Sequence, residues 1–221
     1  MKELIYFDNA ATTPIRPEVY KEIKPYIEEH FGNPSSIYSI ARDSKKAIDK
    51  ARQQVADALN AQPAEIYFTG CGSESDNWVL KGVSSALKNK GIITTCIEHH
   101  AILHTCEYLE KNGFDVTYLP VDEYGKISLD DLKAAIRPET ILVSVMFANN
   151  EIGTVEPIKE IGAICHEKGI YFHTDAVQAF GHIKIDVQDM NIDFLSISGH
   201  KIGAPKGIGA LYIRKGCKID N

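Results

Sequence analysis

The feature that most constrains the fold is an alternation of short apolar runs with amphipathic helical segments along most of the chain. Seven apolar runs have the length of strands, at 65–69, 92–97, 115–119, 141–147, 170–174, 194–198 and 208–213. Helical spacing of apolar residues is found at 17–30, 37–59, 74–88, 101–111, 129–135 and 158–168. This order predicts an α/β fold: a mainly parallel, seven-stranded sheet with helices on both faces, in three layers.

The size and charge of the chain narrow its class. Its 221 residues suffice for one large α/β domain, which we expect over 16–221, preceded by an irregular arm over 1–15. A net charge of −6 without a basic cluster argues against a nucleic-acid surface. No apolar stretch reaches the length of a membrane span, and the N-terminus is too acidic for a signal peptide. We therefore predict a cytoplasmic protein without a membrane or nucleic-acid partner.

The cysteines are typical of a reduced compartment. There are five, an odd number, and no two form a CxxC pair. We expect free thiols rather than disulfides, and no metal site. The five are Cys71, Cys96, Cys106, Cys165 and Cys217.

Lys201 is the most informative single residue. It follows the apolar run 194–198 and precedes a glycine-rich stretch, Ile202–Gly209. Partial desolvation at a strand end lowers the pKa of an amine toward reactivity, and the biological aldehyde that condenses with such a lysine is pyridoxal 5'-phosphate. An ordinary strand-end lysine is the competing interpretation.

Other strand ends carry residues that fit the same cofactor, because ligands of parallel sheets bind beyond the carboxyl ends of the strands. The turn from Gly70 to Ser73 leads into a helix and suits a phosphate, with Ser73 and Asp76 as a candidate capping box. A well-capped helix without a ligand is the alternative. The turn has neither a GxxxxGK[ST] nor a GxGxxG pattern, so a nucleotide is not indicated.

Three further strand ends supply polar side chains. His99 can lie against an aromatic ring or cap a helix. Asn150 can donate to a phenolate oxygen or simply shape its loop. Asp175 follows an apolar run, so its carboxylate is expected to be buried and to need a partner; a protonated pyridine nitrogen would serve, and helix capping is the alternative.

Six stretches, in order along the chain, together resemble the cysteine desulfurases of the NifS/IscS kind, which are class V, fold-type I pyridoxal phosphate enzymes. They are Tyr6–Pro14, Phe31–Ser36, Phe68–Asn77, Asn149–Gly153, Asp175–Gln178 and Ser198–Lys201. The resemblance implies the large, cofactor-binding domain of that fold, a homodimer, and pyridoxal 5'-phosphate as the cofactor.

The resemblance also implies residue roles. Lys201 corresponds to the lysine that holds the cofactor, and Asp175 to the partner of its ring nitrogen. His99 corresponds to the stacking histidine, which also takes part in proton transfer. The remaining contacts correspond to Asn150 and Gln178 near the phenolic oxygen, and to Gly72, Ser73, Ser198 and His200 at the phosphate.

The chain departs from the family pattern in two respects. The small C-terminal domain of the family is expected to be absent, and with it the cysteine that accepts sulfur, an arginine for the substrate carboxylate and a threonine that reaches the neighbouring subunit. None of the five cysteines stands at the position of that nucleophile, although Cys71 lies in the phosphate turn. Tyr38 also stands where a histidine is expected.

The implied reaction converts L-cysteine to L-alanine and passes sulfur to an enzyme thiol, for an iron–sulfur scaffold or for tRNA thiolation. We expect this chain to be the cofactor-binding part and to be inactive alone. Two alternatives stay open: another class V enzyme, either a selenocysteine lyase or an aminotransferase, and a non-catalytic dimerising module.

Overall fold

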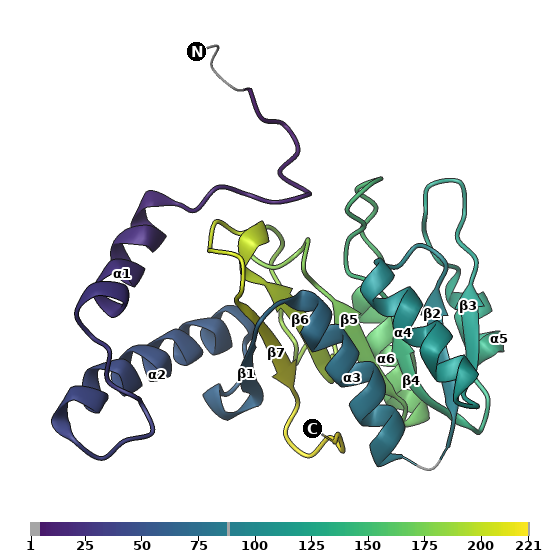
Figure 1. The fold of residues 1–221 in the computed structure, drawn as a ribbon. Coiled ribbons are helices and arrows are strands. Elements are labelled where there is room, and N and C mark those ends of the chain that lie inside the picture. Colours follow the sequence, from purple (N-terminus) through teal and green to yellow (C-terminus); the bar gives the residue numbers. More distant parts are fainter. Residues whose placement is uncertain (1–4, 88, 221) are drawn as a thin grey trace.

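The computed structural model describes residues 5–87 and 89–220, which form a seven-stranded sheet in the order β1-β7-β6-β5-β4-β2-β3 (Figure 1). Strands β2 to β6 are parallel, and β7 runs antiparallel to both of its neighbours. The predicted mainly parallel sheet is therefore confirmed. The strands are β1 Ile66–Thr69, β2 Gly91–Thr95, β3 Asp115–Leu119, β4 Thr140–Ser144, β5 Tyr171–Asp175, β6 Phe194–Ser198 and β7 Gly209–Ile213.

Helices cover both faces of this sheet, as predicted. Helices α3 and α4 pack together over one face, where they share an apolar cluster with β2, β4, β6 and β7. The end of α2, together with α5 and α6, packs on the opposite face. The helices are α1 Pro17–Glu28, α2 Ser39–Leu59, α3 Gly72–Ala86, α4 His100–Lys111, α5 Leu129–Ala135 and α6 Ile158–Lys168.

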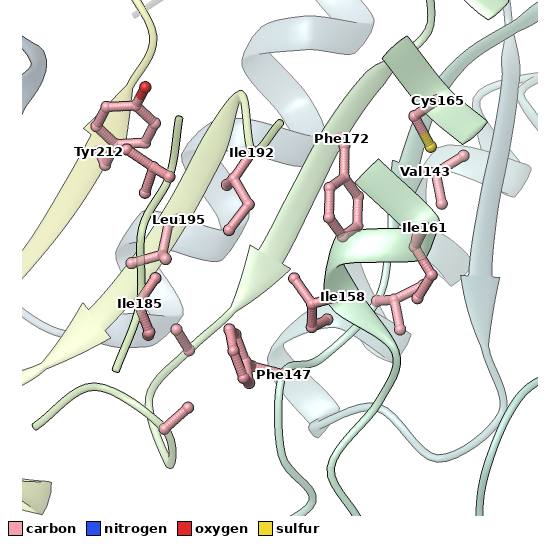
Figure 2. Packing of buried hydrophobic residues seen from close by; sticks show 14 of the residues in the cluster. Val143, Phe147, Ile158, Ile161, Cys165, Phe172, Ile185, Ile192, Leu195 and Tyr212 are labelled. Carbon is pink, nitrogen blue, oxygen red and sulfur yellow. The ribbon is translucent and has the colours of Figure 1, made fainter. Parts of the chain in front are cut away.

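The larger core lies between β5, β6 and helix α6. Figure 2 shows Ile158 and Ile161 of α6 beside Phe172 of β5, and all three side chains are at most 3% exposed. Burying a side chain of this size contributes about 1.5–3 kcal/mol, so this layer fixes the position of the strands whose ends form the site described below.

Two expected strands were predicted too long at their carboxyl ends. Strands were expected at 92–97 and 141–147, but β2 ends at Thr95 and β4 ends at Ser144. The reason is a side-chain acceptor: the backbone N–H of Met146 donates to the Glu98 carboxylate at 2.8 Å instead of to a neighbouring strand. Residues 145–147 stay buried, and the N–H groups of Val145 and Phe147 still donate to carbonyl oxygens of β5, which is why the apolar run continues there. Cys96 is exposed and Ile97 is half-buried.

Parts of three expectations fall outside the described residues: 1–4 of the arm, Lys88 at the end of the predicted helix 74–88, and Asn221. Within the described residues, no helix is both long and apolar enough to span a bilayer. Helix α1, every residue of which is described, buries none of its side chains and lies away from the sheet (Figure 1).

Candidate active site

A cavity of about 720 Å³ lies at the carboxyl ends of the parallel strands. All nine residues that were predicted from the sequence line this cavity, although they lie at or after the ends of five different strands. They are Gly72, Ser73, His99, Asn150, Asp175, Gln178, Ser198, His200 and Lys201. A second cavity, of about 750 Å³, lies at the other end of the strands near Gly169 and contains none of them.

The start of helix α3 forms one wall of the cavity. Cys71, Gly72 and Ser73 line the cavity there. The side chain of the N-cap residue, Cys71, accepts no hydrogen bond from the first N–H groups of the helix. Such a helix start attracts anions. The predicted capping box is wrong, because α3 begins at Gly72, so Ser73 lies inside the helix and Asp76 is turned into the protein at 1% exposure.

Lys201 ends a short turn, Gly199–Lys201, directly after β6. Its Nζ donates to the carbonyl oxygen of Ala11 at 2.9 Å and to that of Ala10. Partial burial lowers the pKa of the Lys201 amine, and the Asp175 carboxylate opposes that shift. The amine thus lies half-buried in the cavity rather than in bulk solvent.

Asp175 is the last residue of β5 and is 6% exposed, as its position in an apolar run predicts. One carboxylate oxygen accepts the backbone N–H of Val177 at 2.9 Å. Burial raises the pKa of Asp175, while the Val177 N–H, His99 and Lys201 act in the opposite direction. A cation placed in the cavity would stabilise the ionised form further.

His99 caps helix α4, because its Nδ1 accepts the N–H of Ala101 at 3.1 Å. The helix-capping interpretation therefore holds for the Nδ1 edge, and a neutral ring carries its proton on Nε2. The ring also lines the cavity. Capping fixes the ring at its edge and is compatible with a ligand stacked on its face.

Two asparagines follow β4, and their side chains have different roles. Asn149 shapes the loop: its Oδ1 accepts the N–H groups of Glu151 and Ile152, and its Nδ2 donates to the Ile97 carbonyl at 2.9 Å. Asn150 is left half-buried at the cavity wall. The loop-shaping interpretation thus applies to Asn149.

The N-terminal arm closes one side of the cavity. Gln178 Nε2 donates to the Ala10 carbonyl at 2.9 Å, and His200 Nδ1 lies 3.0 Å from the Thr12 hydroxyl. Thr13 binds the same turn, since its Oγ1 donates to the His200 carbonyl at 2.8 Å. Sequence reasoning classed this arm as irregular and gave it no contact role, because hydrogen bonds across almost 190 residues leave no local pattern.

Two buried acids were not nominated as site residues. Asp76 lines the cavity, and Glu98 directly precedes His99 in the sequence and is 5% exposed. Glu98 had a usable signal, since a carboxylate that follows an apolar strand must find partners. For Asp76, the sequence pattern predicted a helix-capping residue instead of a buried acid.

Comparison with known proteins decides the family. The sequence profile described as aminotransferase class-V matches residues 5–219. The chain belongs to the class-V aminotransferase family. This membership implies pyridoxal phosphate as the cofactor.

Relatives within the family are named as cysteine desulfurases. A cysteine desulfurase IscS from Clostridium botulinum (strain Kyoto / Type A2) is 64% identical over 223 residues, covering 100% of this chain and 56% of the relative. The IscS of Methanosarcina thermophila is 63% identical over 218 residues, covering 98% of this chain and 54% of the relative. The chain therefore spans about half the length of these relatives, and the expected resemblance to cysteine desulfurases is confirmed.

Solved structures in the family share this fold. A structure titled as SspA in complex with cysteine superposes with a TM-score of 0.96 at 46% identity, over 98% of this chain and 64% of that one. A NifS-like protein gives a TM-score of 0.95 at 41% identity, over 98% and 60% of the two chains. The predicted large-domain fold of this enzyme class is confirmed by these matches.

The residues present fit pyridoxal phosphate. The cavity offers an uncapped helix start for a phosphate, a half-buried amine for an aldehyde and a buried carboxylate for a pyridinium. Glycine is required at the helix start, because a Cβ on Gly72 would lie 2.6 Å from Val177 Cγ2. In the described part of the chain, no group of three or more His, Cys, Asp or Glu side chains could hold a metal ion.

Proposed function

We propose that this chain binds pyridoxal 5'-phosphate through Lys201 and provides the cofactor site of a cysteine desulfurase. The observation that carries the proposal is the placement of the Lys201 amine and the buried Asp175 carboxylate in one cavity, beside an uncapped helix start. Sequence identity of 64% to a cysteine desulfurase supports L-cysteine as the substrate.

Each wall of the cavity has a task in this proposal. The first N–H groups of α3, with Ser73, Ser198 and His200, would hold the phosphate. Asp175 would favour a proton on the ring nitrogen, His99 would offer its ring face to the cofactor, and Asn150 and Gln178 would hold the phenolic oxygen. When bound, the cofactor supplies an electron sink for bond breaking at the substrate Cα.

Lys201 is positioned to act as a base as well as an anchor. Burial lowers the pKa of its amine, which increases the neutral fraction that can accept the α-proton of the substrate at Nζ. The carbonyl oxygens of Ala10 and Ala11 orient the same amine.

The desulfurase reaction yields L-alanine and transfers sulfur to a thiol. The Cys106 and Cys165 side chains are buried, which raises the pKa of each thiol to about 12, so neither suits this role. Cys71 is exposed at the cavity, but it belongs to the proposed phosphate turn. We propose that the chain by itself holds the cofactor without completing desulfuration.

A spectroscopic experiment tests the cofactor proposal. The purified chain is mixed with pyridoxal phosphate, reduced with borohydride and mapped by mass spectrometry. We expect a yellow complex with the label on Lys201, and no label in Lys201→Ala. Lys206→Ala, which changes an exposed lysine in the next turn, is the matched control and should label normally. Labelling spread over surface lysines, or none, would contradict the proposal.

A second assay tests the desulfurase part. The loaded chain is incubated with L-cysteine, and both alanine and sulfide are quantified, with Cys71→Ala in parallel. We expect neither product above the Lys201→Ala background. Sustained sulfide release that disappears in Cys71→Ala would show that Cys71 accepts the sulfur and would overturn our assignment of the thiols.

We further propose that the protein pairs as a homodimer and passes sulfur to an iron–sulfur scaffold or a tRNA-thiolation protein. Support for pairing comes from an outward apolar surface that includes Ile27, Phe31 and Ile37, which are 72%, 85% and 94% exposed. Exposed patches of this kind mark interaction sites. Localisation in the cytoplasm stays a prediction.

A further inference from the structure

Three buried carboxyl groups lie at the strand ends, close enough for their charges to interact. They belong to Asp76 in the first turns of α3, to Glu98 after β2 and to Asp175 at the end of β5, and they are 1%, 5% and 6% exposed. Asp76 and Asp175 both line the cavity. Charges in such a site interact strongly, so the two aspartates cannot both be ionised without a large cost in free energy.

The two aspartates differ in their partners. Asp175 accepts the Val177 N–H and lies in the field of His99 and Lys201. Asp76 has a buried oxygen, Oδ1, without a hydrogen-bond partner among the described residues. An ionised carboxylate with an unpartnered buried oxygen is costly, whereas a protonated one is tolerated.

The nearest basic group, His173, provides no positive charge to stabilise an ionised Asp76. His173 Nε2 lies 3.6 Å from Asp76 Oδ1, which is beyond hydrogen-bond length. Both ring nitrogens of His173 already face hydroxyl groups, Ser144 at 2.8 Å and Ser196 at 3.0 Å. Complete burial lowers the pKa of His173 to about 3, so the ring is neutral and offers no positive charge.

The other groups that act on Asp76 bring it no positive charge. Burial disfavours its ionised form most, the Asp175 carboxylate repels a negative charge there, and the Ser196 hydroxyl favours it. Two carboxyls with such different surroundings take different protonation states, which is how paired acids acquire separate roles.

We propose that Asp76 is a positioning residue that carries the proton of this pair and so leaves the negative charge on Asp175, at the cavity. The location of the proton stands on the geometry of the cofactor-free chain. Only its consequence, an ionised partner for the ring nitrogen, rests on the function proposed above.

Infrared spectroscopy of the cofactor-free chain tests the proton's location. The chain is made with ¹³C-carboxyl aspartate, which separates aspartate bands from those of Glu98. At pH 7 we expect a protonated aspartate carbonyl band that is lost in Asp76→Asn, and in Asp76→Ser should the amide variant not fold. Glu98→Gln is the matched control and should keep the band.

The variant of the partner completes the test. In Asp175→Asn the band should persist but disappear at lower pH than in the parent chain, because the repelling charge is gone. The proposal is overturned if no aspartate band exists at pH 7, or if the band survives Asp76→Asn and is lost in Asp175→Asn.

Cofactor binding then separates this inference from the proposed function. Since Asp76 is neutral, Asp76→Asn should keep the dissociation constant for pyridoxal phosphate within about threefold, whereas Asp175→Asn should weaken it by about tenfold or more. Equal, large losses in both variants would contradict the assigned proton. If the infrared bands behave as expected but the chain binds no cofactor, the proton's location is supported and the proposed function is contradicted.

Discussion

Glu98 shows at the scale of one residue how burial is compensated. Its Oε1 accepts the Met146 N–H and the Thr95 hydroxyl, each at 2.8 Å, while its Oε2 has no partner among the described residues. Complete burial raises the pKa of Glu98 to about 8. The protonated acid therefore holds the end of β2, where His99 follows, against the loop after β4.

This pKa predicts a specific pH dependence of stability. Above pH 4.5 the unfolded chain has lost the Glu98 proton, and the folded chain keeps it up to about pH 8, so the free energy of unfolding falls as the pH rises through that window. His173 acts in the opposite direction between about pH 3 and 6.5, because its pKa is lowered. The Glu98 contribution is thus clearest between pH 6.5 and 8.

Replacement of Glu98 by Gln should remove this contribution. The amide oxygen can keep both hydrogen bonds and the side chain no longer titrates. We expect the decline in the free energy of unfolding between pH 6.5 and 8 to be smaller in the variant by about 2 kcal/mol. Urea unfolding at several pH values measures it, with the exposed Glu123→Gln as control. An unchanged slope would show that Glu98 is already ionised at neutral pH.

The residues of the site were predictable because a parallel sheet gathers the residues that follow its strands. Lys201, Asp175 and His99 each come directly after or at the end of an apolar run, and all three line one cavity. Asp76 was not predictable in this way. A polar residue in the first turn of a helix fits a cap as well as a buried acid, and only the docking of α3 on the sheet decides between them.

At the scale of one element, the start of α3 depends on the absence of a side chain. Gly72 packs against Val177 and Ser198, which belong to segments after β5 and in β6. A methyl group there would push the helix start away from the strand ends. The N–H groups that suit a phosphate would move with it.

Gly72→Ala should therefore weaken binding of pyridoxal phosphate by about tenfold or more and cost about 1–3 kcal/mol of stability. Fluorescence titration and urea unfolding measure the two effects. Gly169→Ala is the control for binding, because this residue caps the end of α6, away from the cavity, and a Cβ there would meet no described atom within 4 Å. Similar cofactor affinity in both variants would show that the helix start does not contribute to cofactor binding.

The element boundaries show where periodicity succeeds and fails. Helices Leu129–Ala135 and Ile158–Lys168 were predicted to the residue, since apolar spacing and packing end together there. Strands β2 and β4 were predicted too long, because residues 96–97 and 145–147 continue the apolar run beyond the last strand residue. At 145–147 the apolar residues report burial, and pairing with β5 continues, but Glu98 takes the backbone donor of Met146. At 96–97 the apolar residues are not buried, so hydrophobicity was misleading there.

At the scale of the whole molecule, the arm links the first residues to the last turn of the site. Thr13 is the centre of this link: its N–H and hydroxyl both donate to the His200 carbonyl, and its Oγ1 accepts the Gly203 N–H at 2.9 Å. Arg16 N–H adds a bond to the Gly203 carbonyl at 2.9 Å. The turn that carries Lys201 is thereby held from outside the sheet.

Thr13→Val should loosen this link, because valine keeps the shape and loses both hydroxyl hydrogen bonds. We expect about 1–3 kcal/mol less protection of residues 9–16 in hydrogen exchange, and weaker binding of pyridoxal phosphate. Thr117→Val on the edge strand β3 is the matched control, since the one hydrogen bond of its hydroxyl within the described residues is a long one from Arg137, at 3.4 Å. Unchanged exchange in the arm would mean that these hydrogen bonds do not hold it.

The apolar surface formed by Ile27, Phe31 and Ile37 gives the last prediction. These side chains are mostly exposed: Ile27 belongs to α1, and Phe31 and Ile37 lie in the segment between α1 and α2. No side chain of α1 is buried. A second copy of the chain is the partner that we propose for this surface.

Burying two such side chains contributes about 3 kcal/mol or more, so Phe31→Ser with Ile37→Ser should raise the dimer dissociation constant by at least about 100-fold. Sedimentation velocity over a range of concentrations measures it. Tyr124→Ser, which removes a side chain that is 71% exposed in a different loop, should leave the dimer unchanged. A parent chain that sediments as a monomer, or a double variant that still pairs, would show that this surface serves another partner.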